Sequence, residues 1–209
     1  MPQHFKNYYI HYSFLLFYGG IFFAITQFEE PFDFIHHTMS QLGKPSRNPD
    51  FWWAYMVVAS ISGLALVPFY LNIAKLKNGD LWTDRMITAI TCLGVFSGFA
   101  LLATALVHAD YRMPHKICGG IYFFSNALIV LIVCALIPRH PRIHKWTLAL
   151  AIPCFVLNGM FLYSSGKMAW AEWLTVLFSY LLALYFTWLI LRAKKSESPG
   201  KAHSRLPLN

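Results

Sequence analysis

The chain has 209 residues, of which 57% are hydrophobic, 17% are aromatic and only 12% are charged. This composition, with a mean hydropathy of +0.47, is typical of an integral membrane protein and excludes an ordinary soluble domain. The net charge of +8 comes mostly from basic residues that flank apolar segments, so nucleic acid is not expected as a partner.

Six apolar segments are each long enough to cross a bilayer, which requires about 20 mostly apolar residues in a helix. A helix satisfies its own backbone within lipid, and the alternating pattern of a membrane barrel is not found in this sequence. The predicted fold is all-α, with six transmembrane helices in a single bundle formed by residues 1–192. A short disordered cytoplasmic tail, residues 193–209, is predicted to follow. The spans are expected at residues 12–28, 53–74, 86–107, 117–137, 146–163 and 170–191.

Basic residues are distributed unequally between the two ends of these predicted helices. Twelve of the 17 Lys and Arg residues lie near the two termini and in the second and fourth connections. Because basic residues are enriched in cytoplasmic segments, both termini are predicted to be cytoplasmic. The first, third and fifth connections are then exoplasmic, and they carry the other five basic residues: Lys44, Arg47, Arg112, Lys116 and Lys167.

The three exoplasmic connections and the adjoining helix ends carry six of the nine acidic residues, together with several histidines and serines, which makes this end of the bundle the candidate site. Histidine and carboxylate side chains suit a borderline divalent metal such as zinc, whose bound water is a nucleophile near neutral pH. We expect His37, Asp110 and His115 as metal ligands. Glu172 would be the general base and Ser40 an orienting or oxyanion-stabilising group.

Substrate contacts are expected from the remaining polar residues of this end, because their cationic groups could meet a phosphate. These residues are His36, Lys44, Arg47 and Arg112.

Each of these residues also has an ordinary structural interpretation. His36 and His37 are adjacent, so on a helix only one of them faces a given centre. Asp110 is able to pair with the nearby Arg112. Glu172 either faces the bundle interior or extends toward the membrane interface, because a carboxylate in a span is energetically costly.

Three short motifs of the chain resemble the DUF998 family of bacterial and archaeal membrane proteins and the broader Frag/DRAM/Sfk-like group. They are the turn Ser40-Gln41-Leu42-Gly43 followed by Pro45, the pair Asp110 and His115, and the pair Glu172-Trp173. The resemblance spans the six-helix layout. It implies a lipid-related role, a site at Ser40, Asp110, His115 and Glu172, and a bacterial inner membrane location.

Three functional hypotheses follow. The first is an enzyme, such as a metal-dependent lipid hydrolase or remodelling enzyme, that acts on a membrane lipid at the exoplasmic face. The second is a non-catalytic lipid-binding, chaperone-like or transport-associated protein that holds a headgroup at the same face. The third, a haem protein, is disfavoured because haem requires histidines that face one another within the spans, whereas these histidines are predicted at helix ends or in loops.

Overall fold

The computed structural model describes the backbone of residues 3–165 and 167–196, and the side chains of residues 9–165 and 167–192. Among the described residues, the secondary structure is entirely helical, with no strand. Six of the helices are long and apolar enough to cross a membrane, which confirms the six predicted spans. The helices are α1 (Gln3–Thr26), α2 (Met39–Leu42), α3 (Trp52–Ile73), α4 (Leu81–Leu106), α5 (Arg112–Leu136), α6 (Leu148–Tyr163) and α7 (Ala169–Ser196), with 3-10 turns η1 (Ala74–Leu76) and η2 (Lys145–Thr147).

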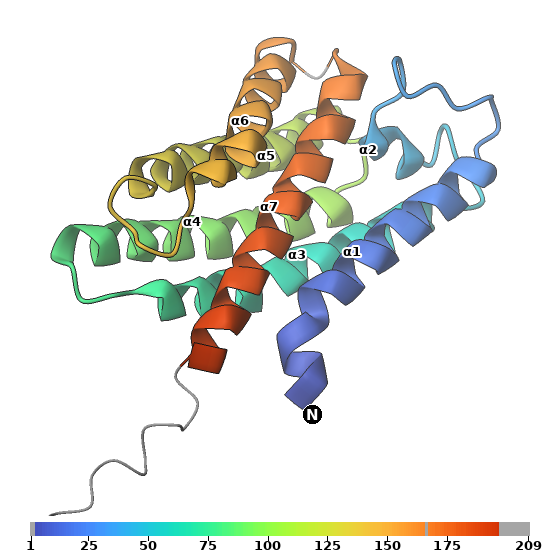
Figure 1. Ribbon diagram of the computed structural model, residues 1–209. Coiled ribbons are helices and arrows are strands. Elements are labelled where there is room, and N and C mark those ends of the chain that lie inside the picture. Colours follow the sequence, from blue (N-terminus) through green and yellow to red (C-terminus); the bar gives the residue numbers. More distant parts are fainter. Residues whose placement is uncertain (1–2, 166, 197–209) are drawn as a thin grey trace, which may run out of the picture.

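The long helices pack against one another in an order that closes on itself. Contacts run from α1 to α3, then to α4, α5, α6 and α7, and α7 in turn contacts α1. The start of α1 and the end of α7 lie at the same end of the molecule (Figure 1). The short α2 lies at the opposite end, within the α1–α3 connection (residues 27–51), near the start of α7.

Several helices extend beyond the segments that hydropathy outlines. α1 begins at Gln3 instead of residue 12, so His11 lies inside a helix and not before it, contrary to the sequence prediction. α4 begins at Leu81, five residues early, because the Asp80 carboxylate caps it by accepting a hydrogen bond from the Thr83 N–H at 2.9 Å. α7 continues to Ser196, past the predicted start of the tail, and residues 197–209 lie outside the described part of the chain.

The α3–α4 contact depends on two glycines that bring the helix backbones together. A Cβ added at Gly63 would lie 2.8 Å from the carbonyl oxygen of Gly98, and a Cβ at Gly98 would lie 2.8 Å from that of Gly63. Small residues allow this close approach, which membrane helices use because lipid provides no hydrophobic drive for their association. This contact fixes α3 and α4 as a tightly packed pair beside the site.

His140 joins two connections at the end of the bundle away from α2. Its side chain is buried. The Arg142 N–H donates to its Nδ1 at 3.2 Å, so Nε2 carries the proton and donates to the Leu76 carbonyl at 2.8 Å. This histidine therefore connects the α5–α6 segment to the end of η1.

Candidate functional site

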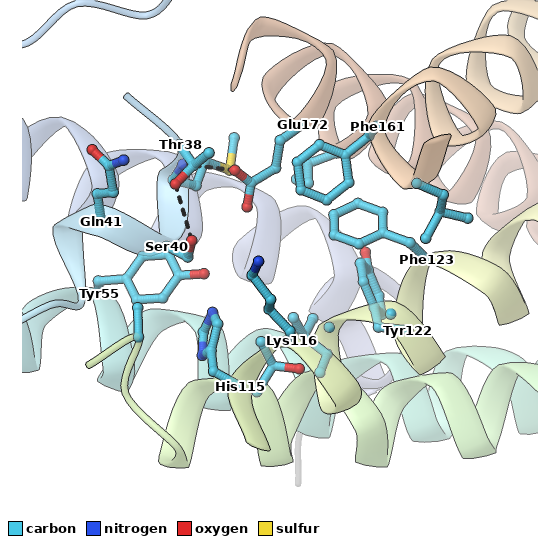
Figure 2. Close-up of a pocket in the computed structure, with 18 of the residues that line it drawn as sticks. Thr38, Ser40, Gln41, Tyr55, His115, Lys116, Tyr122, Phe123, Phe161 and Glu172 are labelled. Carbon is cyan, nitrogen blue, oxygen red and sulfur yellow. Dashed lines mark hydrogen bonds between the residues drawn. The ribbon is translucent and has the colours of Figure 1, made fainter. Parts of the chain in front are cut away.

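A cavity of about 560 Å³ opens among the helices at the end where α2 lies. Its size is within the range of small-molecule and cofactor sites. All six long helices and the α1–α3 connection contribute side chains to it (Figure 2). The inner wall is apolar and aromatic, formed by Phe17, Leu101, Phe123, Phe161, Leu162 and Val176. The polar lining includes Thr38, Ser40, Gln41, Lys44, Tyr55, Arg112, His115, Lys116, Ser165 and Glu172.

Glu172, in the first turn of α7, is 5% exposed and faces the cavity (Figure 2). Its Oε2 accepts a hydrogen bond of 3.0 Å from the backbone N–H of Met39, the first residue of α2. The carboxylate therefore caps α2 from another helix, in the place where a side chain of the same segment would ordinarily do so. Of the two interpretations of Glu172 made from the sequence, the structure shows the one in which it faces the interior.

The neighbouring Trp173 provides a second attachment of the α1–α3 connection to α7. Its indole N–H donates to the carbonyl of His37 at 2.8 Å. Its ring packs edge-on against Phe32 and Phe34, with ring centroids 5.7 and 5.0 Å away. The Glu172-Trp173 pair thus holds the connection over the cavity through both polar and aromatic contacts.

Asp110 attaches the other end of the connection. Its carboxylate accepts hydrogen bonds from the Ser46 hydroxyl at 2.6 Å and the Ser46 N–H at 3.1 Å, and it lies 3.6 Å from the Lys44 ammonium. Partial burial raises the pKa of Asp110, but the Ser46 hydrogen bonds and the Lys44 charge outweigh this effect, so the pKa is lowered overall. Asp110 pairs with Lys44 and not with Arg112, the partner considered from the sequence.

His115 on α5 and Ser40 on α2 both line the cavity, and their side chains point toward one another (Figure 2). The Nδ1 of His115 lies 2.6 Å from the carbonyl oxygen of Val107, so Nδ1 carries the proton and donates it in this bond. In the neutral ring Nε2 is then an acceptor. The Ser40 hydroxyl lies 3.0 Å from that of Thr38.

Arg112 and Lys116 stand one turn apart at the start of α5, and both line the cavity. The ion pairs formed within residues 9–165 and 167–192 include neither of them. Figure 2 shows the Lys116 side chain extending into the cavity. These cations therefore differ from Lys44, whose charge is offset by Asp110.

Four of the predicted substrate and ligand residues, His36, His37, Arg47 and Asp110, lie outside the cavity lining. His36 is on the surface, where its Nδ1 contacts the Asp33 carboxylate, and this hydrogen bond lowers the pKa of Asp33. Arg47 is exposed and pairs with Glu30 at 3.2 Å. His37 packs its ring between Phe28 and Phe32, with centroids 5.4 and 5.2 Å away.

The expected metal ligands His37, Asp110 and His115 are not brought together as one centre. Nδ1 of His37 already accepts the Asp33 N–H at 3.1 Å, while Asp110 is bound to Ser46 and His115 to Val107. Within the described residues, no group of three or more His, Cys, Asp or Glu side chains is placed to hold a metal ion. Each ligand expected from the sequence has a separate structural partner.

Sequence reasoning missed Thr38, Tyr55 and Lys116 as members of the lining. Lys116 was considered only as one of the basic residues that indicate the orientation in the membrane. Its spacing of four residues from Arg112 places both residues on one helix face. Tyr55 lies inside an apolar span and its sequence context carries no signal for a cavity. Thr38 is recognisable only as the residue that precedes α2.

Six long apolar helices with a partly polar cavity at one end define a helical membrane protein of the six-span type. A family model described as "Protein of unknown function (DUF998)" matches residues 13–201, and the chain therefore belongs to the DUF998 family. Neither a curated protein nor a solved structure matches the chain.

Proposed function

We propose that the protein binds a membrane amphiphile in this cavity at the exoplasmic face and acts on its polar end. The observation that carries the proposal is the gradient within a single cavity, from the polar residues near α2 to the apolar wall at Phe123, Phe161 and Val176. A lipid has the same division between a polar headgroup and an apolar chain. Binding sites for such ligands are mostly apolar, with a few placed polar groups.

The exoplasmic assignment rests on charge. The end of the bundle that carries the cavity holds five of the 17 basic residues, and the termini and the other connections hold the rest. Because the richer end faces the cytoplasm, the cavity opens outward. A bacterial inner membrane location and kinship with the broader Frag/DRAM/Sfk-like group are part of this proposal.

Hydrolysis of a headgroup or acyl ester is the catalytic form of the proposal. The acceptor Nε2 of His115 and the Glu172 carboxylate both face the cavity, which is where a general base for an attacking water would have to lie. A zinc-dependent version would require His37 and Asp110 to leave Asp33 and Ser46. A non-catalytic lipid-binding role uses the same cavity without the proton transfer.

Filling the cavity tests ligand binding directly. Gly120 lines the cavity, and a Cβ added there meets no atom within 4 Å, so Gly120→Leu should project into the cavity without a backbone clash. Gly159→Leu is the matched control, because Gly159 is exposed on α6 and a Cβ there is equally free. Native mass spectrometry of the purified protein should show lipid retained by the parent and by Gly159→Leu but lost from Gly120→Leu. Equal retention in both variants would reject the cavity as the binding site.

A second experiment separates catalysis from binding. In His115→Asn, the amide nitrogen replaces Nδ1 as the donor to Val107, while the acceptor at Nε2 is removed. If His115 is the base, hydrolysis of lipids in reconstituted vesicles should fall by about 10²–10⁴-fold, with lipid retention unchanged. Glu172→Gln tests the carboxylate in the same way, and Cys118→Ala on α5 is the control. Parental turnover in both variants would remove the catalytic form.

A further inference from the structure

The face of α5 that lines the cavity has an ordered series of residue types. Arg112, His115 and Lys116 form its first turns, Gly119 and Gly120 follow, and Phe123 comes next. These positions share one helix face because their spacings of three and four residues match the helical repeat. At a rise of 1.5 Å per residue, the series from Lys116 to Phe123 covers about 10 Å along the helix.

Gly119 and Gly120, which follow the two cations along α5, leave open space beside the helix. A Cβ at Gly120 would meet nothing within 4 Å, and one at Gly119 would meet only the Thr104 methyl group at 3.7 Å. The α5 face therefore presents, in order, positive charge, open space and an aromatic ring. Phe161 of α6 extends the aromatic part, since its ring centroid lies 4.6 Å from that of Phe123.

The charge of the lining is positive irrespective of the protonation state of Glu172. Lys44 is offset by Asp110, which leaves Arg112 and Lys116 against the single carboxylate of Glu172. The net charge of these groups is one positive charge if Glu172 is ionised and two if it is protonated. The two cations are exposed, whereas Glu172 is buried, at 5% exposure.

We propose that Arg112 and Lys116 form a phosphate subsite of the cavity, and that the ligand is an amphiphile with a phosphate headgroup, such as an anionic phospholipid. Arginine binds phosphate oxygens through its planar fork, and lysine contributes a point charge. The phosphate meets these cations at the opening, its glycerol part passes Gly119 and Gly120, and the first part of the acyl chains contacts Phe123. Glu172, on the opposite wall, accepts a hydrogen bond from a hydroxyl or ammonium group of the headgroup.

This inference deepens the proposed function and rests on it, so its test includes a variant for each. The protein in dodecyl maltoside is titrated by native mass spectrometry with phosphatidylglycerol, with diacylglycerol of the same chains, and with inorganic phosphate. The double variant Arg112→Gln/Lys116→Gln removes the subsite. The control Arg47→Gln/Lys167→Gln removes the same charge at the same end, from residues outside the lining.

We expect the parent and the control to bind phosphatidylglycerol at least about tenfold more tightly than diacylglycerol, because two charge-assisted contacts are lost without the phosphate. The double variant should bind both lipids equally, at the diacylglycerol level of the parent. Gly120→Leu should lose both lipids, and its failure to do so would overturn the proposed function itself.

A different pattern of results would reject the phosphate subsite without rejecting lipid binding in the cavity. If Gly120→Leu loses both lipids but Arg112→Gln/Lys116→Gln keeps the preference for phosphatidylglycerol, the cavity holds lipid and the subsite assignment is wrong. If inorganic phosphate binds the parent and needs both cations, while neither lipid binds, the subsite is supported and the lipid as its source is overturned.

Discussion

The backbone N–H of Met39 donates a 3.0 Å hydrogen bond to Glu172, although the two residues are 133 positions apart in the chain. Met39 begins α2 and Glu172 lies in the first turn of α7, so this bond joins the α1–α3 connection to a helix that lines the cavity. The bond places a carboxylate in the cavity and also occupies one of its oxygens. Glu172 therefore has a structural role that is present with or without a ligand.

Two substitutions at Glu172 should show whether its hydrogen bond to Met39 or its charge stabilises the fold. Glu172→Ala leaves the buried Met39 N–H without an acceptor, which should cost about 1–3 kcal/mol of unfolding free energy. Glu172→Gln keeps an acceptor oxygen and should lose much less. Unfolding of the parent and both variants in detergent, followed by circular dichroism, measures the difference. Equal loss in the two variants would mean that the charge itself, and not the hydrogen bond, stabilises the fold.

The attachment of the α1–α3 connection to Asp110 predicts a weaker effect on stability. Asp110→Asn removes the charge facing Lys44 and weakens the Ser46 hydrogen bonds, which should cost about 1 kcal/mol because the group is partly exposed. Hydrogen exchange of residues 44–48 should become faster in the variant. Asp50→Asn is the control, since Asp50 is exposed in the same connection and accepts the Trp53 indole N–H through its backbone carbonyl.

The lowered pKa of Asp110 also predicts a pH dependence. A carboxyl group whose pKa is lower in the folded state stabilises the fold above its unfolded pKa, about 3.9 for Asp, and this contribution disappears as the pH falls through the folded value. The stability difference between the parent and Asp110→Asn should be constant at neutral pH and vanish in acid. Lys44 and His108 lie 3.6 and 3.8 Å from the Asp110 carboxylate, and both remain in Asp110→Asn, so the comparison changes only the group at position 110. A difference that grows on acidification would contradict the assignment.

The long helices were predictable from sequence because each carries its own signal, a run of apolar residues of spanning length. Their ends were less predictable, because Asp80 caps α4 before the apolar run begins and α1 extends through polar residues. The four-residue α2 has no such signal. It depends on the contact with Glu172, which only the folded chain brings near.

The candidate site was only partly predictable for the same reason. The clustering of polar residues indicated the end of the helices at which the cavity lies, and Ser40, His115 and Glu172 line this cavity. His37 and Asp110 carry the same residue chemistry as a metal site, but their partners are Asp33 and Ser46. Residue type alone does not indicate which polar groups are already satisfied by the chain itself.

The glycine pair between α3 and α4 gives a stability prediction independent of the site. Gly63→Ala places a methyl group 2.8 Å from the Gly98 carbonyl oxygen, and neither backbone is able to move away cheaply. We expect overpacking to cost about 1–3 kcal/mol of unfolding free energy. Gly159→Ala, where nothing lies within 4 Å, should be neutral or slightly stabilising in the same assay. Similar stabilities for the two variants would show that the helices separate readily at this crossing.

The compartment of the cavity is tested by the accessibility of two exposed positions at opposite ends of the molecule. Ile35, in the α1–α3 connection, is 62% exposed, and Lys77 is exposed between η1 and α4. Single cysteines are introduced at each position after the natural Cys92, Cys118, Cys134 and Cys154 are replaced. If the basic end faces the cytoplasm as proposed, an impermeant maleimide added to intact cells should label Ile35→Cys at once and Lys77→Cys only after lysis. The reverse pattern would place the cavity on the cytoplasmic side and, with it, the headgroups that reach Arg112 and Lys116.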